Sequence, residues 1–138
     1  MRIPRKADYG LLALTYLARQ EEGHICYRNE IARRFSISKA MLAKILQRLR
    51  RSGILRSHLG ARGGYSLARP ADTISLAEVL RALGAEVEMP RSTRPALGQG
   101  EPSLAKRVAS ALQRVRDDIQ QVISEVSIAD LADEEEKA

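Results

Sequence analysis

The spacing of apolar residues predicts three helices in the first half of the chain. Leucines over residues 8–20 spread around much of a helix circumference, which predicts a first helix buried on more than one side, with Asp8 near its N-terminal end. Residues 29–35 predict a short second helix, and Ser38 is a good N-cap for a longer third helix over residues 39–51. The third helix has a core stripe at i, i+3, i+4 and i+7: Leu42, Ile45, Leu46 and Leu49.

Alternating apolar and polar residues then indicate a β-hairpin. The alternation runs on both sides of a turn that contains Gly60, Gly63 and Gly64, and glycines readily supply the positive φ angles such turns need. Their spacing fits neither of the common nucleotide-binding glycine motifs. Three apolar residues are expected on one face of the hairpin: Ile54, Tyr65 and Leu67.

The second half predicts two more helices separated by a loop. Ser75 and Glu78 have the spacing of a capping box, whereas residues 85–102 have no periodicity and read as a loop. A helix over 103–127 would be about 37 Å long, more than a small domain covers, so we expect it to pair between two subunits. The alternative is a helix folded back on its own domain. Residues 128–138 read as a frayed acidic tail. The dimerisation stripe is Leu104, Val108, Ala111, Leu112, Val115, Ile119, Val122 and Val126.

Charge divides the chain of 138 residues into two unlike halves. Residues 1–70 hold 15 Lys/Arg and 4 Asp/Glu, a balance of +11, and residues 71–138 hold 8 and 13, a balance of −5. A basic half suggests contact with a polyanion, although a merely solvated surface is the alternative. The sequence contains no long apolar run and no signal-peptide pattern, so we expect a cytoplasmic protein.

The order of elements predicts a mainly α fold with a small β-hairpin, namely a winged helix-turn-helix domain over 1–84. In such domains the second helix of the motif reads the major groove of double-stranded DNA, while the wing lies beside it. Basic residues are expected on phosphates, and the start of the reading helix is expected to set base preference. The candidate DNA-binding residues are Arg2, Lys6, Arg28, Ser38, Lys39, Ala40, Ala43, Lys44, Gln47, Arg56, His58, Arg62, Gly63, Gly64 and Arg69.

Three stretches carry a family resemblance: "RKADYGLLALTYLA", "EIARRFSISKAMLAKILQRLRRSGIL" and "GARGGYSLARPADTISLAEVLRAL". They resemble the IscR/NsrR/CymR-like bacterial regulators of the Rrf-two (Rrf2) family, and the long last helix agrees in placement. The resemblance implies a homodimeric transcription factor whose dimer helices cross and whose two wings flank the reading helices on a palindromic operator. We expect it to act as a repressor. Many members of the family hold an iron–sulfur cluster.

The sequence departs from the cluster-binding members. Those members carry three closely spaced cysteines in the region that corresponds to 85–102, which here contains no Cys and no His. Asp8 matches an acidic position that reaches the partner's cluster in some relatives. The only cysteine is Cys26, so we expect a protein without an iron–sulfur cluster or other cofactor. Cluster-free relatives exist, and one of them responds through a partner enzyme, so a small molecule or a partner protein is expected as effector.

Several alternatives remain on the residues alone. Cys26 could be a redox-sensing thiol, or it could join His24 in an unusual metal site shared between subunits. The long helix could serve an interaction module that does not bind DNA. No nucleophile, base and orienting group occur at a recognisable spacing, so we do not expect an enzyme.

Overall fold

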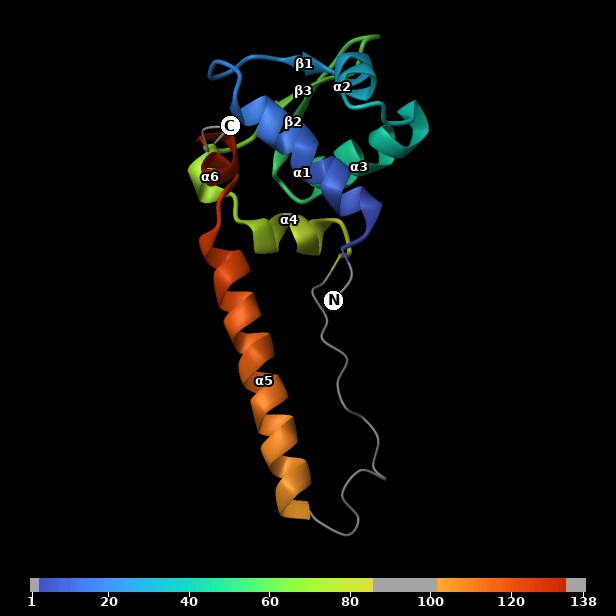
Figure 1. The fold of residues 1–138 in the computed structure, drawn as a ribbon. Coiled ribbons are helices and arrows are strands. Elements are labelled where there is room, and N and C mark those ends of the chain that lie inside the picture. Colours follow the sequence, from blue (N-terminus) through green and yellow to red (C-terminus); the bar gives the residue numbers. More distant parts are fainter. Residues whose placement is uncertain (1–2, 86–101, 134–138) are drawn as a thin grey trace, which may run out of the picture.

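The structure, a computed structural model, describes residues 3–85 and 102–133. Figure 1 shows a cluster of short helices with a small sheet, from which one long helix extends. The helices are α1 Arg5–Ala18, α2 Arg28–Arg34, α3 Lys39–Arg51, α4 Leu76–Ala82, α5 Pro102–Glu125 and α6 Ile128–Asp133, with a 3-10 turn at Ala71–Thr73. The strands are β1 Cys26–Tyr27, β2 Leu55–His58 and β3 Gly64–Leu67.

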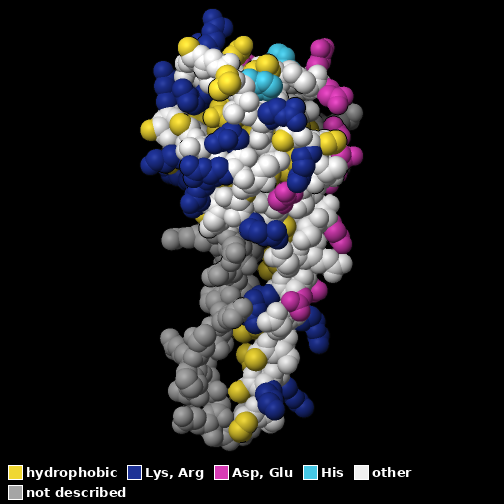
Figure 2. Space-filling view, turned by 180° about the vertical axis from the view of Figure 1, so that it is seen from behind, with side chains coloured by type: hydrophobic (Ala, Val, Ile, Leu, Met, Phe, Trp, Pro, Cys, Tyr) yellow, Lys and Arg dark blue, Asp and Glu magenta, His cyan; other side chains and the backbone are white. Residues whose placement is uncertain are grey.

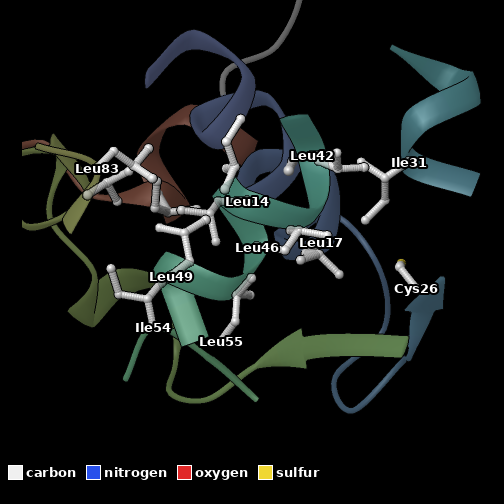
Figure 3. Packing of buried hydrophobic residues seen from close by; sticks show 14 of the residues in the cluster. Leu14, Leu17, Cys26, Ile31, Leu42, Leu46, Leu49, Ile54, Leu55 and Leu83 are labelled. Atoms are coloured by element: carbon white, nitrogen blue, oxygen red, sulfur yellow. The ribbon is translucent and has the colours of Figure 1, made fainter. Parts of the chain in front are cut away.

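The core lies between α1, α3 and the sheet. Leu14 of α1 and Leu46 and Leu49 of α3 have no exposed surface, and these aliphatic side chains interleave in the middle of the domain (Figure 3). Interdigitated aliphatic packing of this kind fixes the angle between two helices. The orientation of α3 is therefore set by its buried stripe, and its other face is left to solvent.

Helix α1 begins at Arg5, three residues before the predicted start. Pro4 has the extended conformation of an N-cap, and its carbonyl oxygen accepts a hydrogen bond of 2.9 Å from the backbone N–H of Ala7. Ala7 is fully buried in a small second cluster with Leu80. The additional helical turn therefore packs against α4.

The hairpin is confirmed, and a third strand joins it. Strand order is β1-β3-β2, all antiparallel, with Leu55 opposite Leu67 and Ser57 opposite Tyr65. Residues directly opposite each other in an antiparallel pair lie on the same face of the sheet, so Leu55 shares a face with Leu67. The prediction that Ile54 shares this face was wrong by one residue, because Ile54 precedes β2 and turns into the core. A one-residue shift exchanges the faces of a strand.

The predicted tail at 128–138 was wrong for its first six residues. Residues 128–133 form α6, and Ile128 is fully buried in the core beside α1. Two backbone hydrogen bonds hold this part of the chain: Leu76 N–H donates to Val126 O at 2.8 Å, and Ile128 N–H donates to Ile74 O at 2.9 Å. The C-terminal end of α5 is thus clipped to the start of α4. Residues 134–138 lie outside the described residues.

Helix α5 extends away from the other elements (Figure 1). None of its residues is buried, and Ile123 near its C-terminal end packs against the cluster of Ala7 and Leu80. The predicted loop at 85–102 lies outside the described residues except for its two ends, Ala85 and Pro102. No described helix combines the length and apolar character needed to cross a membrane.

Candidate DNA-binding surface

A tight turn joins the two helices of the predicted helix-turn-helix. Ser36 has a φ of 53°, a left-handed conformation that is uncommon for residues other than glycine, and it reverses the chain after α2. Ile37 is buried, and its backbone N–H donates to Ala32 O at 2.9 Å. The hydroxyl of Ser38 then accepts from the backbone N–H of Met41 at 3.2 Å, which caps α3 as predicted.

One face of α3 is exposed along its whole length. The buried stripe is the predicted one, so the residues opposite it face solvent, and Ala43 is partly exposed at the edge. Met41 is 40% exposed in the first turn, and the sequence analysis missed it because methionine reads as a core residue. The exposed predicted residues of this face are Lys39, Ala40, Lys44 and Gln47, with Ser38 just before them.

Pairing between β1 and β3 brings the wing to the start of α2. The backbone N–H of Arg28 donates to Gly63 O at 3.0 Å, and the guanidinium of Arg62 lies over the ring of Tyr27 with 5.6 Å between Cζ and the ring centroid. Cation–π contacts of this kind orient an exposed arginine. Tyr27, which the sequence analysis did not single out, therefore positions Arg62.

Two of the predicted glycines act through their lack of a side chain. Gly63 has a φ of 60°, and a Cβ on it would lie 3.4 Å from Cζ of Arg28. A Cβ on Gly64 would lie only 2.6 Å from Cγ2 of Ile25. Both glycines therefore allow the wing to approach the segment before α2, and we assign them to shaping the surface.

The strands of the wing carry further polar groups. Arg56 is exposed on β2, whereas Nε2 of His58 lies 2.7 Å from the hydroxyl oxygen of Ser66. This hydrogen bond crosses the hairpin and fixes the imidazole. His58 therefore belongs to the wing as predicted, and it also supports the hairpin.

The surface formed by α3 and the wing carries one sign of charge. Residues 31–71 contain ten Lys/Arg and no Asp/Glu. Figure 2 shows basic side chains at the upper left of the molecule and acidic side chains along the right-hand edge. Such a one-signed surface attracts a polyanion.

Two predicted DNA contacts, Lys6 and Arg69, do not join this surface. Arg2 lies outside the described residues. Nζ of Lys6 lies beside Gly84, at the C-terminal end of α4. Arg69 forms an ion pair with Glu78 and also donates to Thr73 O at 3.1 Å. This pairing replaces the second half of the expected capping box, because the Glu78 carboxylate turns to Arg69.

The side chains of the predicted dimerisation stripe on α5 are exposed to solvent in the single chain. Leu104, Val108, Val115 and Val122 are 43–58% exposed, and the other members of the predicted stripe include the partly exposed Leu112, Ile119 and Val126. An apolar stripe of this length is unusual on the surface of a monomer.

Cys26 is in the core, on β1, at the side of Ile31 (Figure 3). It has no exposed surface, and burial, with the negative charge of Glu30, raises the pKa of its thiol to about 11. Glu30 is held by the Tyr16 hydroxyl, which donates to Oε1 at 2.6 Å, and this hydrogen bond lowers the pKa of the Glu30 carboxyl. The described residues contain no group of three or more His, Cys, Asp or Glu that could hold a metal ion.

Comparison with known proteins agrees with this geometry. The profile of the Rrf2 family, described as "Iron-dependent Transcriptional regulator", matches residues 3–134. The chain belongs to the Rrf2 family. A Mycobacterium tuberculosis protein named as an HTH-type transcriptional regulator is 32% identical to this Rrf2 protein over 137 residues, covering 96% of this chain and 81% of that protein.

Solved structures of Rrf2-type regulators share the fold. CymR, the global cysteine regulator of Bacillus subtilis, superposes with a TM-score of 0.75 at 30% identity, covering 96% of each chain. The oxidised form of Staphylococcus aureus CymR gives 0.78 at 30% identity, covering 99% of this chain and 100% of that chain. IscR of T. potens gives 0.71 at 26% identity, covering 95% and 85%. The winged-helix fold and the assignment to transcription regulation are therefore confirmed, and these relatives are regulators and not enzymes.

Proposed function

We propose that this Rrf2 protein is a homodimeric, cytoplasmic transcription regulator that binds a palindromic double-stranded operator. The observation that carries the proposal is the basic surface formed by the exposed face of α3 and the wing. Residues 31–71, which include both elements, contain no acidic residue. The N-terminal part of such a helix reads base edges in the major groove. Ala40 offers apolar contact, for instance to thymine methyl groups, and Lys44 offers a hydrogen-bond donor.

The wing supplies contacts that depend little on sequence. Arg62 and Arg56 are exposed, and the guanidinium of Arg62 is oriented by Tyr27. Arginine contacts with phosphate position a protein on the duplex and make binding salt-dependent. A bound dimer occupies the promoter, so we propose repression as the outcome.

Dimerisation follows from the exposed stripe on α5. A helix of 24 residues with no buried position is stabilised when its apolar side packs on an equivalent helix. In a two-fold arrangement the same stripe serves both subunits, and two α3 helices then face two half-sites.

We further propose that the protein works without an iron–sulfur cluster. The single thiol of each chain is buried in the core with a raised pKa, and metal ligation requires an accessible thiolate. Residues 86–101 contain only Glu86, Glu88 and Glu101 as ionisable ligands, and carboxylates suit iron–sulfur chemistry poorly. The donor set of this chain therefore does not fit the cluster of its relatives, and the effector is instead a small molecule or a partner protein.

The DNA-binding surface is tested by selection of bound sequences from a random library, followed by titration at several salt concentrations. Arg62→Ala should weaken binding to every selected sequence and reduce the salt slope by about 0.9. Arg114→Ala removes the same charge from α5 and should leave both unchanged. Equal weakening by the two variants would contradict the assigned surface, and a changed base preference with Arg62→Ala would show that the wing reads bases at this position.

The dimer is tested by sedimentation of Val115→Asp. A charge in the seam between two helices costs several kcal/mol, so this variant should be a monomer with weak operator binding. Gln113→Asp places the same charge on the polar side of α5 and should remain a dimer. A wild-type protein that sediments as a monomer at micromolar concentration would refute the arrangement.

The cluster-free proposal is tested by anaerobic purification. The protein should be colourless, and iron chelators should not change its affinity for the operator. Visible absorption bands with stoichiometric iron and sulfide would refute the proposal.

A further inference from the structure

The tip of the wing presents one isolated leucine. Leu59 directly follows β2, and its exposed fraction is 106%, so its side chain touches no other part of the described chain. The next most exposed large hydrophobic residue of the described chain is Val108, at 58%. Leu59 is therefore the most exposed large hydrophobic residue of the described chain, and it lies in the turn between β2 and β3.

The turn that follows Leu59 is short and is closed by a backbone hydrogen bond. The backbone N–H of Gly63 donates to Gly60 O at 3.3 Å, which closes the loop immediately after Leu59. Gly60 and Gly63 have no side chains, and Ala61 has only a methyl group. Leu59 is thus the only large apolar side chain at a tip whose other long side chain, Arg62, is turned back over Tyr27.

Cationic groups stand behind this apolar point. Arg56 is on β2, three residues before Leu59, and Arg62 is turned back over the Tyr27 ring. Arg28 contacts the wing at Gly63. The tip therefore combines an apolar point with flanking guanidinium groups, and carries no acidic group that would repel phosphate.

We infer that Leu59 is an apolar wedge that enters the minor groove of DNA and partly unstacks one base-pair step, an inference that rests on the proposed DNA-binding function. The minor groove is about 6 Å wide, so it admits a tip in which Gly60, Ala61 and Gly63 are small and Arg62 is turned back. Leucine is among the side chains that proteins insert between base pairs. Arg56 and Arg62 lie near the tip and are available to pair with phosphates along the groove.

The wedge adds specificity outside the bases that α3 reads. Pyrimidine–purine steps such as TA and CA unstack more easily than others, so insertion favours an operator with such a step beneath the wing. Leu59 would thus select sequence through deformability, without a hydrogen bond to any base.

The test uses operators selected by the full-length wild-type protein and by Leu59→Ala. Wild-type sites should contain a pyrimidine–purine step at a fixed distance outside each half-site, and sites selected by Leu59→Ala should keep the half-site and lose this step. On the wild-type site, affinity should fall about tenfold, which is the scale of one leucine side chain removed from an apolar contact. A 2-aminopurine base at the step should brighten with wild-type protein and stay dim with Leu59→Ala.

Leu59→Met serves as the matched control, because methionine is also used as a wedge, and it should restore both the step preference and the fluorescence. All three proteins should fold alike, since the side chain has no contacts. Unchanged step preference and unchanged fluorescence in Leu59→Ala would overturn the wedge while leaving half-site recognition intact. A wild-type protein that selects no sequence would instead refute the proposed function, so the two failures are distinguishable.

Discussion

The Cys26 thiol should react very slowly in the native protein. Its side chain has no exposed surface, and burial raises its pKa from 9.0 to about 11. At pH 8 a thiol with a pKa of 9.0 is about one-tenth thiolate, and a thiol with a pKa of 11 is about one-thousandth thiolate. Ionisation alone therefore slows alkylation roughly 100-fold, and burial slows it further because the reagent must await local opening.

Intact-mass kinetics with iodoacetamide at pH 8 measure this rate. The control is Cys26→Ala carrying Ser110→Cys, which places one thiol at an exposed position on the polar side of α5. Wild-type protein in concentrated guanidinium chloride gives the unfolded rate. Native Cys26 reacting within about tenfold of the Ser110→Cys control would refute the closed site and revive redox sensing by this thiol.

The same pKa shift predicts a loss of stability at alkaline pH. Because the folded-state pKa lies above the unfolded value, the stabilisation is complete below pH 9 and is lost as the pH rises toward 11. Two pKa units correspond to about 2 to 3 kcal/mol. The free energy of unfolding of the wild-type protein should therefore fall more steeply over this range than that of Cys26→Ala, and parallel curves would contradict the assignment.

Three further substitutions test the frame that holds the DNA-binding surface. Glu30→Gln removes the carboxylate that joins α1 to α2. Because the pKa of Glu30 is lowered in the folded protein, its stabilisation is present above the unfolded pKa and is lost as the pH falls through the folded pKa. The free energy of unfolding of the variant should therefore be lower by about 1 kcal/mol near pH 7 and should depend less on pH in the acid range, as measured by urea titration. Gly10→Ala should destabilise by about 1 kcal/mol, because its Cβ would lie 2.5 Å from Cδ1 of Leu83, and Leu83→Val in the same chain should recover part of the loss in thermal melts. Ile128→Ala should cost about 2 to 5 kcal/mol, whereas the exposed Asp133→Ala should change the melting curve little; similar curves for the two would contradict a structural role for α6.

Local signals in the sequence predicted helix α3 well. The bounds of α3 are those expected, because a serine cap and a four-residue apolar stripe act within one or two turns. Helix α6 was missed because the burial of Ile128 depends on packing against α1, more than a hundred residues earlier in the chain. An acidic composition at the end of a chain gives no sign of such packing.

The candidate surface was predictable in composition and less so in detail. The basic residues of α3 and the wing were evident, but the pairing of Arg69 with Glu78 depends on the path of the turn at Ala71–Thr73. The left-handed Ser36 had no glycine to mark it. These features depend on backbone geometry that residue type alone does not encode.

Two backbone hydrogen bonds fix the C-terminal end of α5 to the start of α4, so a tilt of the long helix pivots at this end, within the DNA-binding domain. At 24 residues α5 is about 36 Å long, so a tilt of roughly 5° at this end displaces Pro102 by about 3 Å. Conversely, an effector that displaces the Pro102 end of α5 by about 3 Å rotates the other end of the helix by only roughly 5°. This small rotation would be transmitted to the core through the two hydrogen bonds between residues 74–76 and 126–128. The buried residues of α3 belong to the same core. In the proposed dimer, a large displacement at the far end of α5 would therefore become a small change in the spacing between the two α3 helices.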